Sequence, residues 1–256
     1  MIHKSAVIDS TADICADVTI GAFTVIGANV TIGEGTVIGP HVTINGTTSI
    51  GKNNHIYQYA SVGEDAQDKK YAGELSYLEI GDNNIIREFT TIHRGTTQDK
   101  NITSIGNDNL LMAYAHVAHD CVIANNVILA NAASLGGHVH VGSSVILGGF
   151  SIVHQFCQLG EHSFSAMGSA ITKDVPPFIM VGGRPTQPHG INKVGLERRG
   201  YSKDTILEIK RAYKILYKSG LKLTAAFEQL EEKAKSVPEL ECMVTFLKNS
   251  NRSILR

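Results

Sequence analysis

Residues 19–51 read TIGAFTVIGANVTIGEGTVIGPHVTINGTTSIG, and an isoleucine recurs there at every sixth position, from Ile20 to Ile50. The same step gives an aliphatic residue at every slot from Ile2 to Val62. It resumes over 80–92 and over 105–159, and glycine often follows the aliphatic residue. A period of six is neither the 3.6 of an α-helix nor the 2 of a simple strand.

Such a period predicts a coil with three short flat faces, in which each face points one aliphatic residue inward. About eighteen residues then make one turn of the coil. Successive turns stack by parallel strand pairing, ~4.8 Å apart. The repeat therefore predicts an all-β parallel β-helix.

The repeat fades after Leu159, and the prolines in residues 174–177 are expected to end the coil, because proline cannot join a strand ladder. A helical period follows, which predicts a small α-helical domain. We assign residues 1–185 to the β-helix and residues 186–256 to a linker and helical domain. Three helices are expected: one capped by Ser202, one running from a Thr224 cap to Lys235, and one from Pro238 to near Lys248.

Two excursions interrupt the hexads, near residues 63–79 and 96–104. Long loops in a repeat scaffold are usually functional, because the scaffold itself does not need them. If each loop is one detour between faces, a single face collects the inward residues of five stacked turns, and both loops leave from its edge. Those residues are Val62, Ile92, Val117, Leu135 and Val153.

The same assignment of hexads to faces aligns five histidines along one edge of the coil, within ~14 Å along the coil axis. Three of them could bind a metal ion, as in trimeric β-helical carbonic anhydrases. Alternatively, the imidazoles could act as a general base and as substrate contacts. His3, His41, His55 and His162 are expected to be ordinary surface turn residues. The aligned histidines are His93, His116, His119, His138 and His154.

The bulk composition excludes several classes of protein. The chain has 256 residues, 43% of them hydrophobic, and a formal net charge of −1, which does not favour nucleic acid or a membrane surface. Its four cysteines show no CxxC spacing, and the N-terminus lacks the apolar run of a signal peptide. We therefore expect a cytoplasmic protein with reduced cysteines and no membrane insertion.

Seven stretches, including the helical tail, closely resemble the acyl-carrier-protein–UDP-N-acetylglucosamine O-acyltransferase family of lipid A, and so lipopolysaccharide, biosynthesis. The resemblance spans essentially the whole chain, and likeness to hexapeptide-repeat proteins implies left-handed winding. The stretches are IYQYASVG (56–63), QDKKYAGE (67–74), TIHRGT (91–96), DNLLM (108–112), AHVAHDC (115–121), HQFC (154–157) and GLERRG (195–200).

The resemblance implies transfer of a 3-hydroxyacyl chain from acyl carrier protein to the 3-hydroxyl of UDP-N-acetylglucosamine. It implies that His119 is the general base and that the backbone N–H of Gly137 stabilises the oxyanion. Asp120 is a candidate support for His119, although the stacking scheme places it nearest His138. No cofactor and no metal ion are expected.

The resemblance also implies a set of substrate contacts. Val194 stands where familiar family members carry a glutamate near the nucleotide. Met167 replaces a glycine of members that prefer long chains, so we expect an acyl chain shorter than fourteen carbons, of ten to twelve. The contacts are Asp68, Lys70, His93, His116 and His138 for the sugar, and His154, Gln155, Asn192, Arg198 and Arg199 for the nucleotide, diphosphate or carrier protein.

Between Lys193 and Lys222, nine basic residues face three acidic ones, which predicts a docking surface for an acidic carrier protein. The exposed faces of a lone coil, and a site along its edge, favour a homotrimer. Four alternatives remain open at this point: acylation of a 3-amino sugar analogue, the later N-acyltransferase of the pathway, a metal-dependent carbonic anhydrase, and a purely structural β-helix.

Overall fold

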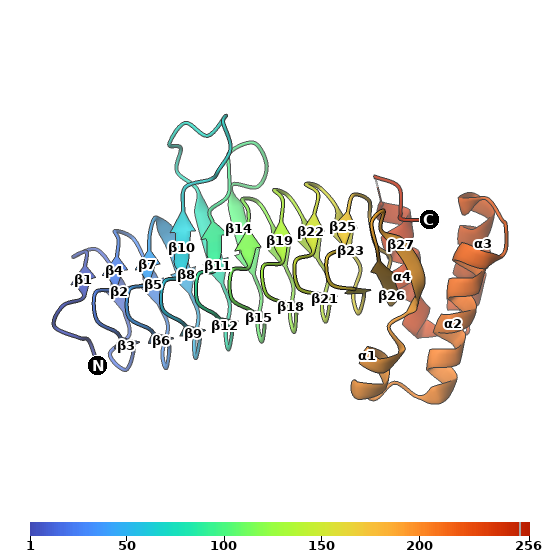
Figure 1. Ribbon diagram of the computed structural model, residues 1–256, viewed down its shortest axis with the longest axis horizontal. Helices are drawn as coiled ribbons and strands as arrows, with labels where there is room; N and C mark the ends of the chain where they lie inside the picture. Colours follow the sequence, from blue (N-terminus) through green and yellow to red (C-terminus); the bar gives the residue numbers. More distant parts are fainter. Residues whose placement is uncertain (251) are drawn as a thin grey trace.

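The computed structural model describes residues 1–250 and 252–256. It is a three-sided column of short parallel strands, with helices at its C-terminal end (Figure 1). Along most of the column, each turn of the chain adds one strand to each of three sheets. The parallel β-helix expected from the six-residue period, and the C-terminal helical domain expected from the helical period that follows it, are both confirmed.

We number the sheets by the strand with which each begins. Sheet 1 consists, in spatial order, of β1 (Val7–Ile8), β4 (Val25–Ile26), β7 (Thr43–Ile44), β10 (Ser61–Glu64), β13 (Thr91–His93), β16 (His116–Val117), β19 (Ser134–Leu135), β22 (Ile152–Val153) and β25 (Ala170–Ile171). Sheet 2 consists of β2 (Asp13–Ile14), β5 (Thr31–Ile32), β8 (Thr47–Ile50), β11 (Tyr77–Ile80), β14 (Ile102–Ile105), β17 (Val122–Ile123), β20 (His140–Val141) and β23 (Gln158–Leu159). Sheet 3 consists of β3 (Thr19–Ile20), β6 (Val37–Ile38), β9 (His55–Ile56), β12 (Ile85–Ile86), β15 (Leu110–Leu111), β18 (Ile128–Leu129), β21 (Ile146–Leu147), β24 (Phe164–Ser165), β26 (Ile179–Gly182) and β27 (Gln187–Ile191).

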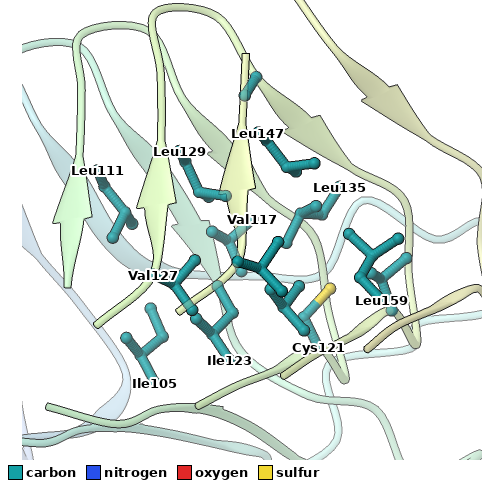
Figure 2. Packing of buried hydrophobic residues seen from close by; sticks show 14 of the residues in the cluster. Ile105, Leu111, Val117, Cys121, Ile123, Val127, Leu129, Leu135, Leu147 and Leu159 are labelled. Carbon is teal, nitrogen blue, oxygen red and sulfur yellow. The ribbon is translucent and has the colours of Figure 1, made fainter. Parts of the chain in front are cut away.

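The strands pair so that each inward aliphatic residue stacks on the equivalent residue of the next turn. Ile26 is paired with Ile44, and Ile44 with Val62, and all three side chains are buried. Figure 2 shows such residues from the three sheets converging on one narrow core, with Cys121 among them. Aliphatic side chains of similar size fill this interior without large rings.

The five hexad residues expected on one face do share it, because β10, β13, β16, β19 and β22 are consecutive strands of sheet 1. The first loop (residues 65–76) leaves β10 and the second loop (residues 94–101) leaves β13, and both lead into sheet 2. They project together from one side of the column (Figure 1). The column edge from which they leave, between sheets 1 and 2, is called corner 1–2.

Corner 3–1, between sheets 3 and 1, carries an aromatic ladder. Its residues adopt φ angles of 57° to 64°, and neighbouring rings stack with centroids 4.9–5.2 Å apart. The spacing follows from the distance between paired strands. The rings are exposed, so the ladder is an uncovered apolar ridge. Its members are Phe23, His41, Tyr59, Phe89 and Tyr114.

The two prolines of residues 174–177 do not end the coil, contrary to expectation. Val175 bridges Leu159 of sheet 2, and β26 then pairs with β24 in parallel. The prolines lie at the corner between these two pairings, where no ladder hydrogen bond from their nitrogen is needed. The coil stops only where β27 turns back antiparallel onto β26.

The helical segment consists of α1 (Lys193–Arg198), α2 (Lys203–Lys218), α3 (Leu223–Ala234), the short 3₁₀ helix η1 (Pro238–Leu240) and α4 (Glu241–Asn249). Ser202 caps α2 as expected, because its hydroxyl accepts a hydrogen bond from the Thr205 N–H at 3.0 Å. The Thr224 cap is wrong: α3 begins at Leu223, with Lys222 as N-cap and no side-chain cap hydrogen bond. Pro238 opens the last helical stretch as expected.

The C-terminal tail returns to the end of the column. The Ser250 hydroxyl donates to the buried carboxylate of Asp174 at 2.6 Å, and Ile254 forms a parallel bridge with Asp174. These contacts fasten the helical domain to the last turns of the coil. In the part of the chain described, no helix has both the length and the apolarity needed to span a bilayer.

Corner 2–3 contains a buried ladder of asparagines, Asn54, Asn84 and Asn109. The Asn84 amide group donates to the Asn54 side-chain oxygen at 3.0 Å and to the Gly106 carbonyl at 2.9 Å. Its own oxygen accepts from the Asn109 N–H at 3.0 Å. The ladder therefore satisfies backbone groups of successive turns inside the column.

Replacing Asn84 with alanine should lower the free energy of unfolding by about 2–3 kcal/mol, because buried polar groups lose their partners. Urea unfolding measures this loss. Asn125→Ala is the matched control: the Asn125 oxygen accepts from the Asn107 N–H at 2.7 Å, but at an exposed position that water can reach. Equal losses in the two variants would contradict a role for burial.

Candidate active site

A pocket of about 380 Å³ opens at corner 1–2, beside the ends of β16, β19 and β22. Outward-facing Ser134 and Ile152 of sheet 1 form part of its wall. Five residues expected to act in catalysis or binding line this pocket: His93, His116, His119, Gly137 and Gln155. Gln67 of the first loop also lines the pocket, and sequence reasoning missed it.

His119 is held by a carboxylate. Its Nδ1 lies 2.9 Å from Oδ2 of Asp120, which also accepts the Thr96 hydroxyl at 2.7 Å, while Oδ1 accepts the Thr96 N–H at 2.9 Å. Burial raises the pKa of Asp120, but the hydrogen bonds from His119 and Thr96 outweigh it and hold that pKa below its ordinary value. A carboxylate only accepts hydrogen bonds, so Nδ1 carries the proton and Nε2 is free to accept one.

This pairing corrects the stacking scheme, which placed Asp120 nearest His138. The Asp120 oxygen lies 3.9 Å from Nδ1 of His138 but 2.9 Å from Nδ1 of His119. Asp120 adopts a φ of 59° at the corner, and Thr96 of the second loop binds its carboxylate. The contact with Thr96, which cannot be foreseen from the six-residue repeat, sets the direction in which the Asp120 carboxylate points.

Gly137 lines the pocket next to His119, and its backbone lies close to the His119 ring. A Cβ atom at this position would lie 2.6 Å from Cε1 and 2.7 Å from Nε2 of His119. No side chain fits there without moving the imidazole, so glycine is needed for the ring to occupy its place. Within the described residues, the Gly137 N–H has no hydrogen-bond acceptor.

His138 belongs to a second imidazole–carboxylate pair. Its Nδ1 lies 2.9 Å from Oδ2 of Asp99, a residue of the second loop that sequence reasoning did not select. Its ring stands at 89° to the ring of His119, with centroids 5.0 Å apart, and stacks on Phe156 at 4.3 Å. His119 and His138, which were expected to align along one edge of the coil, therefore do lie next to each other.

His93 and His116 also line the pocket, with ring centroids 5.3 Å apart. Nδ1 of His93 lies 2.5 Å from the Asp65 carbonyl, and Nδ1 of His116 lies 2.7 Å from the Thr91 hydroxyl. Burial, together with the neighbouring charges of His93 and His119, lowers the pKa of His116 to about 4. His116 is therefore neutral at neutral pH.

Arg94 ties the first loop to the column. Its guanidinium donates to the Gly63 carbonyl, to the Asp65 carboxylate and to the Tyr71 hydroxyl. Of the two expected sugar contacts in this loop, Asp68 is half-buried and accepts from the Lys70 N–H at 3.0 Å, while Lys70 is exposed. Neither lines the pocket in the single chain.

The expected nucleotide contacts are not all beside this pocket. Asn192, Val194 and Arg198 line a separate pocket of about 440 Å³ over sheet 3. Asn192 also caps α1, since its Oδ1 accepts from the Gly195 N–H at 3.1 Å. Arg199 turns back toward the Gly195 carbonyl, which accepts from its guanidinium at 3.4 Å. The expected site residues are thus divided between two faces of the column.

Three further histidines and Met167 lie elsewhere. His154 is exposed, and its Nδ1 lies 3.1 Å from the Gln155 carbonyl rather than in the pocket. Met167 is 78% exposed at corner 3–1, the edge of the aromatic ladder. His41, expected to be a surface turn residue, is one and belongs to that ladder. His162 lies on a turn, but it is half-buried against Phe178 and Tyr201 and so packs the end of the column.

The donor set fits the metal interpretation poorly. In residues 1–250 and 252–256, the group that could hold an ion is His119, Asp120 and His138, with ligand atoms within 4.8 Å of one another. These are two imidazoles and one carboxylate, whereas the carbonic anhydrase alternative needs three metal-binding histidines. The imidazole nitrogens involved already share carboxylates, as an orienting pair does.

Family models match both parts of the chain. A model described as UDP N-acetylglucosamine O-acyltransferase, domain 2, matches residues 174–255, and one described as bacterial transferase hexapeptide (six repeats) matches residues 11–46 and 102–137. The hexapeptide repeats agree with left-handed winding of the coil, as expected from the sequence.

Full-length relatives carry the same name. Proteins named acyl-[acyl-carrier-protein]–UDP-N-acetylglucosamine O-acyltransferase from Alkalilimnicola ehrlichii and Herminiimonas arsenicoxydans are 55% and 51% identical to this chain, over 100% of it and 99% of each relative. The solved structures of LpxA from Acinetobacter baumannii and of the UDP-N-acetylglucosamine acyltransferase from Francisella novicida have TM-scores of 0.97 and 0.98, at 48% and 47% identity. They are matched over 100% of this chain and over 99% and 94% of their own length.

These matches extend over the column, both loops and the helical tail, so they include every residue that builds the two pockets. They do not favour the N-acyltransferase, carbonic anhydrase or purely structural alternatives. The chain belongs to the acyl-[acyl-carrier-protein]–UDP-N-acetylglucosamine O-acyltransferases, the enzymes of the first step of lipid A biosynthesis.

Proposed function

We propose that this chain transfers a 3-hydroxyacyl group from acyl carrier protein to the 3-hydroxyl of UDP-N-acetylglucosamine, with His119 as general base. One observation carries the assignment: the Asp120 carboxylate lies 2.9 Å from Nδ1 of His119, which leaves Nε2 as the proton acceptor beside Gly137. An imidazole suits this task because its pKa ordinarily lies near neutral pH.

The reaction balances without a cofactor. Nε2 of His119 takes the proton of the sugar hydroxyl as its oxygen attacks the thioester carbonyl carbon. The C–O bond forms, and the negative charge moves to the carbonyl oxygen, where the N–H of Gly137 stabilises it. The C–S bond then breaks, and the imidazolium returns its proton to the thiolate of the carrier protein.

The sugar is held by groups around the base. His93, His116 and His138 offer imidazole nitrogens, and Asp68 and Lys70 reach it from the first loop. His116 acts as a neutral group, because its low pKa keeps it unprotonated. The nucleotide, the diphosphate or the carrier is contacted by Gln155, which lines the pocket, by the exposed His154, and by Asn192, Arg198 and Arg199. Val194, in place of a glutamate, gives the nucleotide an apolar neighbour.

Replacing His119 with alanine should lower kcat by roughly 10²–10⁴-fold, because no other group takes the hydroxyl proton. Steady-state assays of the purified protein with hydroxyacyl carrier protein and UDP-N-acetylglucosamine measure the effect. The same assays with the 3-amino sugar nucleotide test the alternative acceptor. An unchanged melting temperature shows that the variant is folded, and near-normal transfer by such a variant would rule out His119 as the base.

The protein works as a homotrimer with its sites between subunits. The expected contacts are divided between sheet 1 of a chain and its sheet 3, and the exposed aromatic ladder runs along corner 3–1 between these faces. Three copies packed around corner 3–1 would cover the ladder and turn sheet 1 of one copy toward sheet 3 of the next. Two half-sites would then form one site.

Mixed assemblies test this arrangement. His119→Ala lies in the sheet 1 pocket and Arg198→Ala in the sheet 3 pocket, and each should be inactive or strongly impaired alone. When two differently tagged chains are co-expressed, random mixing in a trimer leaves about a quarter of the sites with both residues intact. Activity should return to about that fraction of the unaltered enzyme.

His119→Ala mixed with Asp120→Ala is the control, because both residues come from the same half-site and no intact site can form. If the His119 and Arg198 variants also failed to restore activity in mixed assemblies, the shared site would be wrong.

An acidic carrier protein docks near α1 and α2. Three lysines, one acidic residue (Glu197) and three aliphatic residues line a pocket there; the lysines are Lys193, Lys203 and Lys210, and the aliphatic residues are Ile191, Ile206 and Leu207. A lining with more basic than acidic groups, together with apolar side chains, suits an acidic helical protein, and salt should weaken the encounter. The four cysteines are all free, which agrees with a reducing, cytoplasmic location.

Met167 limits the length of the acyl chain. From the pocket at corner 1–2, the chain crosses the outer face of sheet 1 over half-exposed Ile152 toward corner 3–1, where Met167 projects. A methionine there fills space that glycine leaves open. The accepted chain is therefore shorter than fourteen carbons, with ten to twelve expected.

Met167→Gly should shift the preference toward longer hydroxyacyl chains, by about tenfold in relative kcat/KM for each two added carbons that find room. A series of hydroxyacyl carrier proteins from ten to sixteen carbons, assayed in competition, measures the shift. Met167→Leu, which keeps the volume, is the control. An unaltered length profile in the glycine variant would remove Met167 as the limit.

A further inference from the structure

The second loop brings a carboxylate to His138, next to His119, that the hexad pattern does not supply. Asp99 reaches across to His138, with its Oδ2 2.9 Å from Nδ1 of that ring. The two residues are 39 positions apart in the chain, and the second loop leaves sheet 1 at β13, two turns before the strand β19 that His138 follows. His138 thereby acquires a partner of the same kind as His119 has in Asp120.

Two contacts act on the His138 ring in different ways. Stacking on Phe156, with an interplanar angle of 5°, fixes the plane of the ring but not which edge faces which way. A half-turn about the Cβ–Cγ bond would exchange Nδ1 with a carbon atom. The Asp99 carboxylate distinguishes these orientations, because it accepts a hydrogen bond from Nδ1–H and gains none from C–H.

The same contact selects the tautomer of a neutral ring. With its proton on Nδ1, His138 presents Nε2 as an acceptor, which suits a sugar hydroxyl or an amide N–H. Without Asp99, the proton can reside on Nε2, and the ring would then present a donor at that edge. A carboxylate behind an imidazole is a common way to fix this choice.

We propose that Asp99 is a positioning residue for acceptor binding: it fixes the orientation and tautomer of His138 and so sets what His138 offers the sugar nucleotide. This inference rests on the sugar contact proposed for His138. The second loop then orients two imidazoles of the site, His119 through the contact of Thr96 with Asp120 and His138 through Asp99.

A role in folding alone does not account for Asp99. Its side chain is 36% exposed, and residues 97–100 around it are all exposed. Removal of this carboxylate leaves no cavity in the column and exposes no core residue. The loop also keeps its other anchors, since Thr96 remains bound to Asp120 and the Thr97 hydroxyl to Glu74. We therefore assign Asp99 a role in the active site rather than in folding.

Asp99→Ala should raise KM for UDP-N-acetylglucosamine about 5- to 10-fold, the loss expected for one well-oriented hydrogen bond. We expect kcat to change less than about threefold and KM for the acyl carrier protein to stay the same, since neither the base nor the docking surface is altered. Asp99→Glu should recover much of the loss, because it restores a carboxylate. Lys100→Ala, an exposed neighbour in the same loop, is the matched control and should be neutral.

A double-mutant cycle with His138→Ala separates the possible outcomes. If Asp99 acts through His138, Asp99→Ala has no further effect once His138 is alanine. An equal loss in both backgrounds, or no loss in the single variant, overturns the role of Asp99. If His138→Ala itself left KM for the sugar nucleotide unchanged, the sugar contact proposed for His138 would fail, and the Asp99 inference with it.

Discussion

The parallel pairing of each inward residue with the one a full turn later is the constraint on which the rest of this molecule depends. Ile26 pairs with Ile44 and Ile44 with Val62, and every such side chain fills the same narrow interior. A slip of one position would turn a buried residue outward, so the register is strongly specified. The loops are tolerated because each returns the chain to phase: Tyr77, after the first loop, pairs with Thr47 of the turn before it.

The same register converts distance along the chain into contact at the corners. His119, His138 and Phe156 follow one another at intervals of 19 and 18 residues, about one full turn each, and neighbouring rings have centroids 5.0 Å and 4.3 Å apart. Gly137 precedes His138 by one position, so its backbone must lie against the ring of His119, and any side chain there would collide with that ring. The proposed general base and the glycine backbone beside it thus come together because successive turns stack.

The sequence predicts only part of the site, because some of its residues belong to the repeat and others to the two loops. The period, with the assumption that each loop is one detour between faces, is enough to place sheet 1, the row of histidines and the points where the loops leave, because all of them then depend only on counting. The loop side chains do not repeat, so no counting predicts that Thr96 binds Asp120, that Asp99 reaches His138 or that Arg94 ties down the first loop. Asp120 was assigned to the wrong histidine for the same reason. The predicted cap of α3 was wrong for a different reason. Thr224 has a side chain that can cap a helix, but α3 already begins at Leu223, with Lys222 as its N-cap.

The expected contacts lie on two faces of the column, which bears on how copies of the chain associate. A straight column with a constant register presents each kind of surface as a stripe along its length, whether a row of histidines or a row of aromatic rings. A stripe can pair with a stripe of another copy only if the two columns run side by side, which makes parallel association natural for this fold. On the proposed trimer, the repeat that builds each half-site also brings the complementary half-site to the same height. Catalytic geometry and assembly would then follow from one six-residue period.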